Sequence, residues 1–273
     1  MRACLGYCGA ILLVLVAAAA CAAQEPPAKD HHPWGKFRPG AWKKLRLVTQ
    51  SYQDRKLIST TTQETTATLL EVTADEYALR LEVTVEVAGK RFTHPPQTIR
   101  RRLLGDTNNG PPTVKKLGNE TLTIHSRVVA TEVFELTSSG DLVNRTLVMR
   151  YSPEFFPYVL QQNLKAESSD GSVTLYETQQ ETLAFNMPFK VLTEIHDAAF
   201  VRTLHRKQDE TTVTMEVHSE SVPGGVVSHS AKKLDASQVV IEQSTLELVD
   251  YGFADNEEPA RRNRRFFSRG GRE

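Results

Sequence analysis

Six apolar side chains alternate with polar or small ones across residues 76–88, and no other feature of the sequence restricts the fold as strongly. They are Tyr77, Leu79, Leu81, Val83, Val85 and Val87. Successive side chains of a strand point to opposite faces, so this order predicts one strand with a buried face. A helix would spread the same residues around its circumference.

The alternation recurs along the chain, and turn-forming residues separate the recurrences. Less regular alternating stretches cover 128–136 and 143–151, and the turn sequence SSGD at 138–141 lies between them; DTNNG at 106–110 and SSDG at 168–171 are further turn sequences. Closely spaced strands joined by turns favour an antiparallel meander over crossover connections. Residues 56–73 contain no glycine or proline. Because typical strands have about 5 to 6 residues, this length predicts a large curved sheet or a bulge.

The expected fold class is therefore all-β: a long-stranded, curved antiparallel meander that forms a half-barrel or an open barrel. One segment leaves room for a minor helix. Residues 188–206 place Phe189, Leu192 and Ile195 at helical spacing, but they also fit two short strands broken around 196–199. Both interpretations stay open on the sequence alone.

The first 23 residues have the order of a secretory signal peptide. Arg2 follows the initial methionine, an apolar run covers 10–20, and small residues continue to Ala23. A membrane-spanning helix needs about 20 apolar residues, which is longer than this run. The sequence therefore predicts export of the mature chain to the periplasm, the cell envelope or the medium.

All three cysteines, Cys4, Cys8 and Cys21, lie in or beside this segment. The mature chain then has no disulfide, no cysteine nucleophile and no thiolate metal site. Cys21 follows three alanines at the end of the apolar run, an order that resembles the lipobox of bacterial lipoproteins. Two alternatives remain: Cys21 is lipidated, or cleavage occurs near Ala23 and Cys21 is discarded.

Composition divides the rest of the chain into three parts. Residues 24–39 contain four prolines and few aliphatic residues, which predicts an extended tether, and 40–252 is expected to be one antiparallel β domain. Residues 253–273 are rich in arginine and are expected to be disordered. The tail residues that could contact a polyanion are Arg261, Arg262, Arg264 and Arg265. A purely solvated tail is the alternative. Lysine plus arginine equals aspartate plus glutamate, 33 against 33, so no nucleic-acid partner is expected.

Short Thr- and Glu-containing motifs suggest that the β domain contains two similar meanders. Glu120–Thr121–Leu122 has a counterpart in Glu181–Thr182–Leu183, and later motifs match at an offset that drifts from 61 to 66 residues. Threonine-rich strands resemble one another by composition alone, so a shared composition is the alternative explanation.

The sequence contains none of the common catalytic motifs. It has no GxSxG elbow, HExxH pair, P-loop or GxGxxG loop, so no enzyme activity, catalytic residue or cofactor is predicted. His205, His218 and His229 fall near consecutive predicted strands and could form a three-histidine metal site. His218, however, is out of phase with Val213 and Val217, which places it on the polar face, so no metal is expected either.

The segments GAWKKLRLVT, TLLEVTADEYALRLEVTVEVAGKRF and VPGGVV resemble uncharacterised exported bacterial β-rich proteins. More remotely, a long curved sheet behind a signal peptide is similar to the periplasmic lipoprotein-carrier and lipoprotein-receptor half-barrels. Those carriers hold acyl chains on the concave face of an open barrel plugged by helices. The first likeness covers most of 40–252 and has no activity to transfer, and the second implies a concave binding face.

The expected function is that of an exported, non-enzymatic cell-envelope protein whose curved sheet serves as a binding or scaffold module, for an apolar ligand, a lipid or another envelope protein. Membrane contact is expected only through a lipid anchor. The aromatic residues expected to contact a ligand are Trp42, Tyr77, Phe92, Phe155, Phe156 and Tyr158. Two alternatives remain: an envelope hydrolase, which would need a buried histidine beside a serine or aspartate in a cleft, and a structural or adhesion module.

Overall fold

Fourteen β-strands make up most of the chain that the computed structural model describes, which is 27–104 and 111–254. Within these residues the one helical element is a short 3-10 helix, Lys29–His31. The strands are β1 (Trp42–Gln53), β2 (Lys56–Val72), β3 (Glu76–Val87), β4 (Lys90–Thr93), β5 (Gln97–Arg102), β6 (Thr113–Ile124), β7 (Arg127–Ser139), β8 (Val143–Tyr151), β9 (Val159–Ser168), β10 (Thr174–Val191), β11 (Glu194–Lys207), β12 (Glu210–Ser219), β13 (Val226–Leu234) and β14 (Val240–Gly252).

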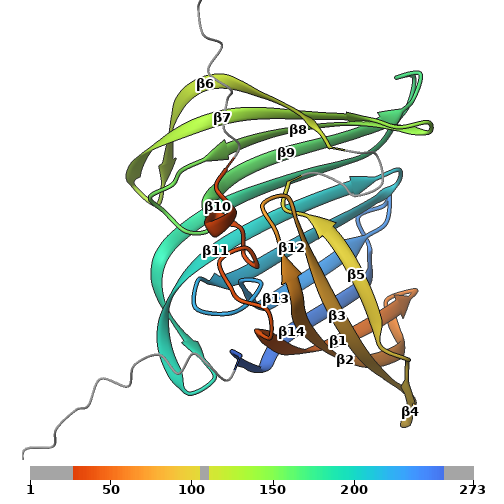
Figure 1. The fold of residues 1–273 in the computed structure, drawn as a ribbon. Helices are drawn as coiled ribbons and strands as arrows, with labels where there is room; N and C mark the ends of the chain where they lie inside the picture. The colour runs from red at the N-terminus through yellow and green to blue at the C-terminus, as the bar shows by residue number, and fades with distance from the viewer. Residues whose placement is uncertain (1–26, 105–110, 255–273) are drawn as a thin grey trace, which may run out of the picture.

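All of these strands belong to one antiparallel sheet. Its order is β4-β3-β2-β1-β14-β13-β12-β11-β10-β9-β8-β7-β6, and β5 also pairs with β3. Since β1 pairs with β14, the first and last strands lie inside the sheet; β4 and β5 form one edge along β3, and β6 forms the other. Figure 1 shows the sheet strongly curved, with the chain before β1 on its concave side. The predicted class, a curved and open antiparallel meander, is confirmed.

Two local predictions can be compared with the strands. The register of β2 with β3 shifts between Leu69 and Glu71, which is the bulge expected in a strand of 17 residues. The helical interpretation of 188–206 is wrong. That segment is the end of β10 and most of β11, and the turn between them lies at 192–193, where Leu192 has a φ of 53°.

The segment before β1, residues 27–41, packs against the concave face and is called the inner segment below. Trp34 is 7% exposed and packs with Leu69 of β2 and Leu79 of β3. Backbone hydrogen bonds Gly40 N to Leu69 O (2.7 Å) and Leu69 N to Ala41 O (2.8 Å) fix its end. In residues 27–39 the structure therefore differs from the extended tether predicted for 24–39. That prediction rested on the prolines and the few aliphatic residues, whereas an aromatic side chain, Trp34, anchors this segment.

The turns that follow β8 and β12 have the same backbone hydrogen bonds. Ser152 N donates to Tyr158 O (2.8 Å), and 67 positions later Ser219 N donates to Gly225 O (2.8 Å). The strand registers repeat at the same offset: Phe134↔Met149 corresponds to Val201↔Glu216, and Met149↔Gln162 corresponds to Glu216↔His229. Strands β7–β9 and β11–β13 are thus two similar meanders at a constant offset of 67, where the sequence motifs suggested a drift from 61 to 66.

Candidate functional site

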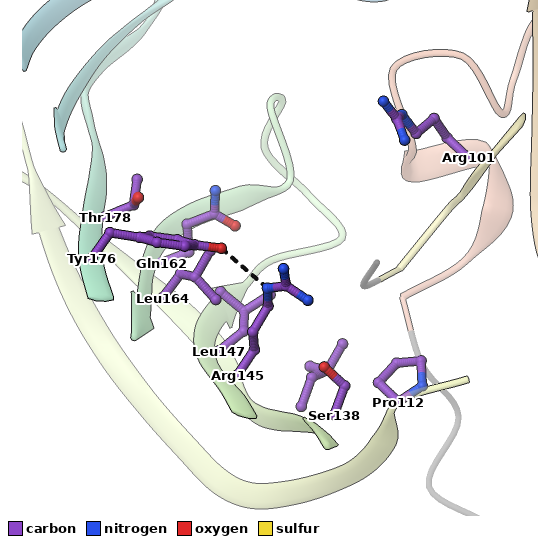
Figure 2. A pocket seen from close by; sticks show the side chains of 10 residues that line it. Arg101, Pro112, Ser138, Arg145, Leu147, Gln162, Leu164, Tyr176 and Thr178 are labelled. Carbon is purple, nitrogen blue, oxygen red and sulfur yellow. Dashed lines mark hydrogen bonds between the residues drawn. The ribbon is translucent and has the colours of Figure 1, made fainter. Parts of the chain in front are cut away.

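A cavity of about 460 Å³ lies on the concave face between β5 and strands β7–β10. Figure 2 shows its lining side chains. They are Arg101, Pro112, Leu136, Ser138, Arg145, Leu147, Gln162, Leu164, Tyr176 and Thr178. Arg145 and Leu147 belong to the same face of β8 as Tyr151, which contacts the inner segment, so the cavity opens on the concave side. Its size is within the range of about 300–1,000 Å³ found for small-molecule sites.

The polar half of the cavity is organised by Arg145. Its Nε donates a hydrogen bond to the Tyr176 hydroxyl oxygen (3.0 Å), and Figure 2 shows the rest of the guanidinium directed into the cavity. Tyr176 is supported from the next strand, because its ring lies 5.5 Å from that of His205. His205 Nδ1 is in turn 2.8 Å from Thr178 Oγ1. These contacts from three strands hold the arginine in one orientation.

A second cavity of about 280 Å³ adjoins the first, with Leu147 and Gln162 lining both. Its sheet side includes Met149, Val159 and Tyr151, and its other side is the inner segment through Pro27, Ala28, His31, His32 and Pro33. The two cavities thus form one path along β8, from an arginine-containing end to an end closed by the inner segment.

Side chains of the inner segment hold that closed end together. His31 Nδ1 contacts the Tyr151 hydroxyl, and the His31 ring stacks on Tyr158 with centroids 4.2 Å apart. The Tyr158 hydroxyl donates to Glu220 Oε1 (2.6 Å), and Lys36 Nζ pairs with the same oxygen (3.0 Å). Burial and the neighbouring Glu220 carboxylate raise the pKa of Tyr158, so this hydroxyl keeps its proton and acts as a donor.

Beneath Trp34 lies a group of buried and half-buried titratable side chains, which we call the Lys43 cluster: Lys43, Glu216, His218 and His229. Burial lowers the pKa of Lys43 to about 7 against the attraction of Glu216. Its Nζ donates to Val226 O (3.3 Å) and lies 5.6 Å from the Trp34 ring centroid. Glu216 Oε2 is 2.9 Å from His218 Nε2. Burial would raise the pKa of Glu216, but the bond with His218 and the nearby cations lower it overall.

His218 lies on the polar face of its strand, as the alternation predicts, but this face is turned inward. His218 is 8% exposed and shares the concave face with Glu216, whereas Met215 on the other face is 39% exposed. The prediction assumed that the apolar face of the strand is the buried one. In β12 the polar face is turned inward, where Glu216 and His218 contact each other beside Lys43. No group of three or more metal-binding side chains occurs in 27–104 and 111–254.

A shallow groove of about 270 Å³ brings together His196 of β11 and Ser221 of the β12–β13 turn. Ser221 Oγ is 3.1 Å from His196 Nδ1 and 3.0 Å from Ser219 Oγ. The Glu194 carboxylate is 3.6 Å from His196 Nε2, which is beyond hydrogen-bond length. A nucleophilic serine needs a base that is itself oriented by a third group. In this groove Glu194 would be the third group, and its contact with His196 is the weak one.

None of the six aromatic residues predicted to contact a ligand lines either concave cavity. Tyr77 packs beside Trp34, with its ring 4.9 Å from that of His32, and Tyr158 holds His31 as described above. Phe156 makes an edge contact with Tyr158, at 5.8 Å between centroids.

The other three aromatic residues are Trp42, Phe155 and Phe92. Trp42 at the start of β1 covers Gly252, where a Cβ would be 2.6 Å from the indole Nε1. Phe155 packs on Phe185 with centroids 4.9 Å apart. Phe92 in the edge strand β4 is 54% exposed. Cys21 and the tail arginines, Arg261, Arg262, Arg264 and Arg265, lie outside the described residues.

Sequence reasoning missed the residues that do line the cavity, above all Arg101, Arg145 and Tyr176. Arg145 is in register with Ala166 of β9 and Ser138 of β7, and no local motif shows this pairing. A usable signal existed in β8: Arg145 occupies the same alternating face as Leu147, so an inward-facing arginine on an apolar face could have been noticed.

Comparison with known proteins gives little further information. No protein-family model and no curated protein matches the chain. One similar solved structure is described as a candidate lipoprotein from Parabacteroides distasonis. It is 12% identical, has a TM-score of 0.31, and the match covers 77% of this chain and 95% of that one. A candidate exported protein with a YmcC-like fold from Bacteroides fragilis is 11% identical, with a TM-score of 0.30 and coverage of 79% and 97%. At these TM-scores the likenesses carry no argument about function.

The described part of the chain contains no helix that is both long and apolar enough to cross a membrane.

Proposed function

We propose that this protein is an exported, non-enzymatic binding module of the cell envelope, which holds a ligand with an apolar part on the concave face of its sheet. The observation that carries the proposal is the pair of adjoining cavities, about 460 and 280 Å³, which combine the apolar side chains of Leu136, Leu147, Leu164 and Met149 with a comparable number of polar ones. Small-molecule sites are concave and mostly apolar, with a small number of placed polar side chains.

Binding of the apolar fluorescent probe N-phenyl-1-naphthylamine tests this proposal directly. Leu147 lines both cavities, so Leu147→Trp fills the space between them and is expected to weaken probe binding about tenfold. Leu142→Trp is the matched control, because Leu142 lies in a turn and is 80% exposed. No saturable probe binding by the unaltered protein, or equal loss in both variants, would contradict the proposal.

A second measurement concerns the natural ligand. Protein purified from its native source without detergent is extracted with organic solvent, and the extract is analysed by mass spectrometry. The expected result is a stoichiometric amphiphilic molecule that is reduced in the Leu147→Trp variant. If the extracts of the unaltered protein and of Leu147→Trp contain the same compounds in the same amounts, a carrier role is contradicted.

Export is supported by the order of residues at the amino terminus, and the anchor is tested separately. Labelling with radioactive palmitate, unaltered protein against Cys21→Ser, distinguishes the two alternatives for Cys21. Label that Cys21→Ser abolishes means a lipoprotein, whereas an unlabelled protein with a mature terminus near residue 24 means ordinary cleavage.

The contact between Ser221 and His196 favours a second candidate function, that of an envelope esterase. A reactive serine would be labelled by a fluorophosphonate probe, and Ser221→Ala would abolish the label while Ser219→Ala would not. Absence of labelling at Ser221 removes this candidate and leaves the binding proposal unaffected, because the groove does not contribute to either concave cavity.

A further inference from the structure

Two hairpins on neighbouring strands of the sheet place basic side chains directly beside large apolar ones. They are the β1–β2 and β3–β4 hairpins, and Figure 1 shows the second one, labelled β4, projecting from the lower right of the molecule. Their tips read QDRKLI at 53–58 and EVAGKRFT at 86–93. Val87, the last residue of β3, lies opposite Thr61 of β2, so β2 extends farther in the same direction. We call the two tips, 53–58 and 86–93, the hairpin pair.

The large apolar side chains of the hairpin pair are exposed to solvent. Leu57 is 52% exposed and Ile58 60%, and in the second tip Val87 is 40% and Phe92 54% exposed. A single exposed apolar side chain is common on protein surfaces. Four of them in two adjacent tips, with polar residues around them, are typical of an interaction surface.

The charge of the hairpin pair is positive overall. Arg91 forms an ion pair with Glu64 of β2 (3.3 Å). Arg55, Lys56 and Lys90 are exposed, and no carboxylate of the residues that the structure describes forms an ion pair with them. These three cations are therefore available to an anionic partner. The tips contain four basic residues against two acidic ones: Arg55, Lys56, Lys90 and Arg91 against Asp54 and Glu86.

The other turns at the same end of the sheet have the opposite charge. Because the sheet is antiparallel, the turns that follow β7, β9, β11 and β13 lie at this end too. Each of these four turns contains an aspartate and no basic residue; the aspartates are Asp141, Asp170, Asp209 and Asp235. A negatively charged surface would attract the hairpin pair and repel these turns, so the protein would meet it in one orientation.

We infer that the hairpin pair docks on the surface of a bilayer that contains anionic phospholipid. Arg55, Lys56 and Lys90 lie at the level of the headgroups, and Ile58 and Phe92 enter the interface between headgroups and acyl chains. Basic residues near an anionic membrane and shallowly buried apolar side chains both contribute to such binding. A flat bilayer needs no shaped pocket, and two tips that project in the same direction can reach it together. This contact goes beyond a lipid anchor and does not rest on the proposed function.

The first test is flotation with vesicles, using the full mature chain with Cys21→Ser so that no acyl chain takes part. Binding is expected to vesicles of phosphatidylcholine mixed with phosphatidylglycerol, and added salt should weaken it. Lys56→Gln combined with Lys90→Gln should weaken it about 25-fold, since each basic residue contributes about fivefold. Arg206→Gln combined with Lys207→Gln is the matched control. It removes the same charge from exposed positions at the end of β11, beside Asp209, and should leave binding unchanged.

A second measurement detects entry of the apolar side chains into the membrane. Phe92→Trp places a fluorophore in the hairpin pair, and brominated phosphatidylcholine in the mixed vesicles should quench it. Leu142→Trp is the control, because Leu142 is 80% exposed in the β7–β8 turn at the same end of the sheet. Its fluorescence should change no more than that of the unaltered protein, which has Trp34 and Trp42 only.

A third variant separates the hairpin pair from the arginine-rich tail. In it the four tail arginines are replaced by glutamine, and it should retain vesicle binding; they are Arg261, Arg262, Arg264 and Arg265. The inference is overturned if this variant loses binding while the Lys56 and Lys90 variant keeps it. Equal binding to phosphatidylcholine alone, no vesicle binding, or an unquenched Phe92→Trp would overturn it as well.

Failure of this inference is distinguishable from failure of the proposed function. Binding of N-phenyl-1-naphthylamine should be the same in the Lys56 and Lys90 variant as in the unaltered protein, because neither lysine lines a concave cavity. Unchanged probe binding also shows that the variant is folded.

Discussion

The indole ring of Trp34 lies directly against the backbone of Gly224. A Cβ on Gly224 would be 2.6 Å from Trp34 Cε2, which is closer than carbon atoms approach in proteins, and Gly224 has a φ of 72°. Gly224 N also donates to Pro33 O (2.9 Å), so the turn between β12 and β13 holds the inner segment by its backbone. This contact sets how deeply Trp34 enters the concave face.

Gly224→Ala should displace Trp34 and lower the free energy of unfolding by about 2–4 kcal/mol, because steric overlap adds to the backbone strain of a positive φ. Urea unfolding followed by circular dichroism measures the loss. Gly225→Ala is the control: Gly225 has the same φ of 72°, but its nearest neighbour would be at an ordinary 3.4 Å. It should cost only about 1 kcal/mol, and equal losses in the two variants would show that the indole contact contributes nothing.

Tyr158→Phe removes the hydrogen bond to Glu220 and keeps the ring that stacks on His31. The expected loss is about 1.5–3 kcal/mol in the free energy of unfolding, the usual range for a hydrogen bond to a charged group. The pKa of Glu220 should rise, since this bond is one of the contacts that lower it. Tyr52→Phe removes an ordinary bond to Gln50 and should change stability less. A Glu220 pKa that does not move, measured by NMR titration, would contradict the assignment.

The sequence predicted the fold class because the apolar alternation in β3 is local information. Leu79 and Leu81 face Trp34 and its neighbours, as the pattern requires. The same rule fails in β12, where Glu216 and His218 face inward. A curved sheet covered by a polar and aromatic segment does not need an apolar inner face everywhere, and alternation alone does not say which face that segment covers.

The candidate site was out of reach for a different reason. Arg101 and Arg145 are 44 positions apart in the sequence, and they line one cavity only because the sheet curves. Curvature depends on strand register and bulges along the whole sheet, such as the shifts next to Tyr151 and His218. Of the aromatic residues that the sequence analysis favoured, Tyr77 and Tyr158 contact the inner segment instead.

His32, in the inner segment, makes the stability of the protein depend on pH in the acid range. Burial lowers its pKa to about 4, whereas an unfolded histidine has a pKa of 6.5. Between these values the unfolded chain binds more protons, so stability falls as the pH decreases from about 6.5 to about 4. In the unaltered protein the Trp34 backbone N–H donates to His32 Nδ1 (3.2 Å), and His32→Asn keeps a side-chain acceptor there. Because asparagine does not titrate, the free energy of unfolding of this variant should fall by about 2–3 kcal/mol less over the same pH range.

The measurement is the free energy of unfolding in urea between pH 4.5 and pH 7. His125→Asn is the control, because His125 is an exposed turn residue whose φ of 45° asparagine tolerates well. Burial lowers the pKa of His229 too, so the free energy of unfolding of His32→Asn should still decrease somewhat toward acid pH. A slope identical to that of the unaltered protein would show that His32 is not the group responsible.

Lys43 makes the stability of the protein depend on pH in the alkaline range. Its pKa is about 7 in the folded protein and 10.5 in the unfolded chain, so between these values the folded protein has released a proton that the unfolded chain retains. The free energy of unfolding should therefore rise as the pH increases from about 7 to about 10.5. Lys43→Met should remove most of this rise, on the order of 3 kcal/mol between pH 6 and pH 10 at about 1.4 kcal/mol per pKa unit.

At pH 6 the methionine variant should be the more stable protein, since a buried ammonium group is costly and Glu216 keeps its bond with His218. Lys44→Met is the matched control: Lys44 is the next residue, on the opposite face of β1, and forms a surface ion pair with Glu64 (3.0 Å). It should leave the pH dependence unchanged and lower stability by at most about 1 kcal/mol. If Lys43→Met were instead less stable than the unaltered protein at pH 6, the attraction of Glu216 would outweigh the cost of burying the charge, and the Lys43 cluster would stabilise the fold as an ion pair.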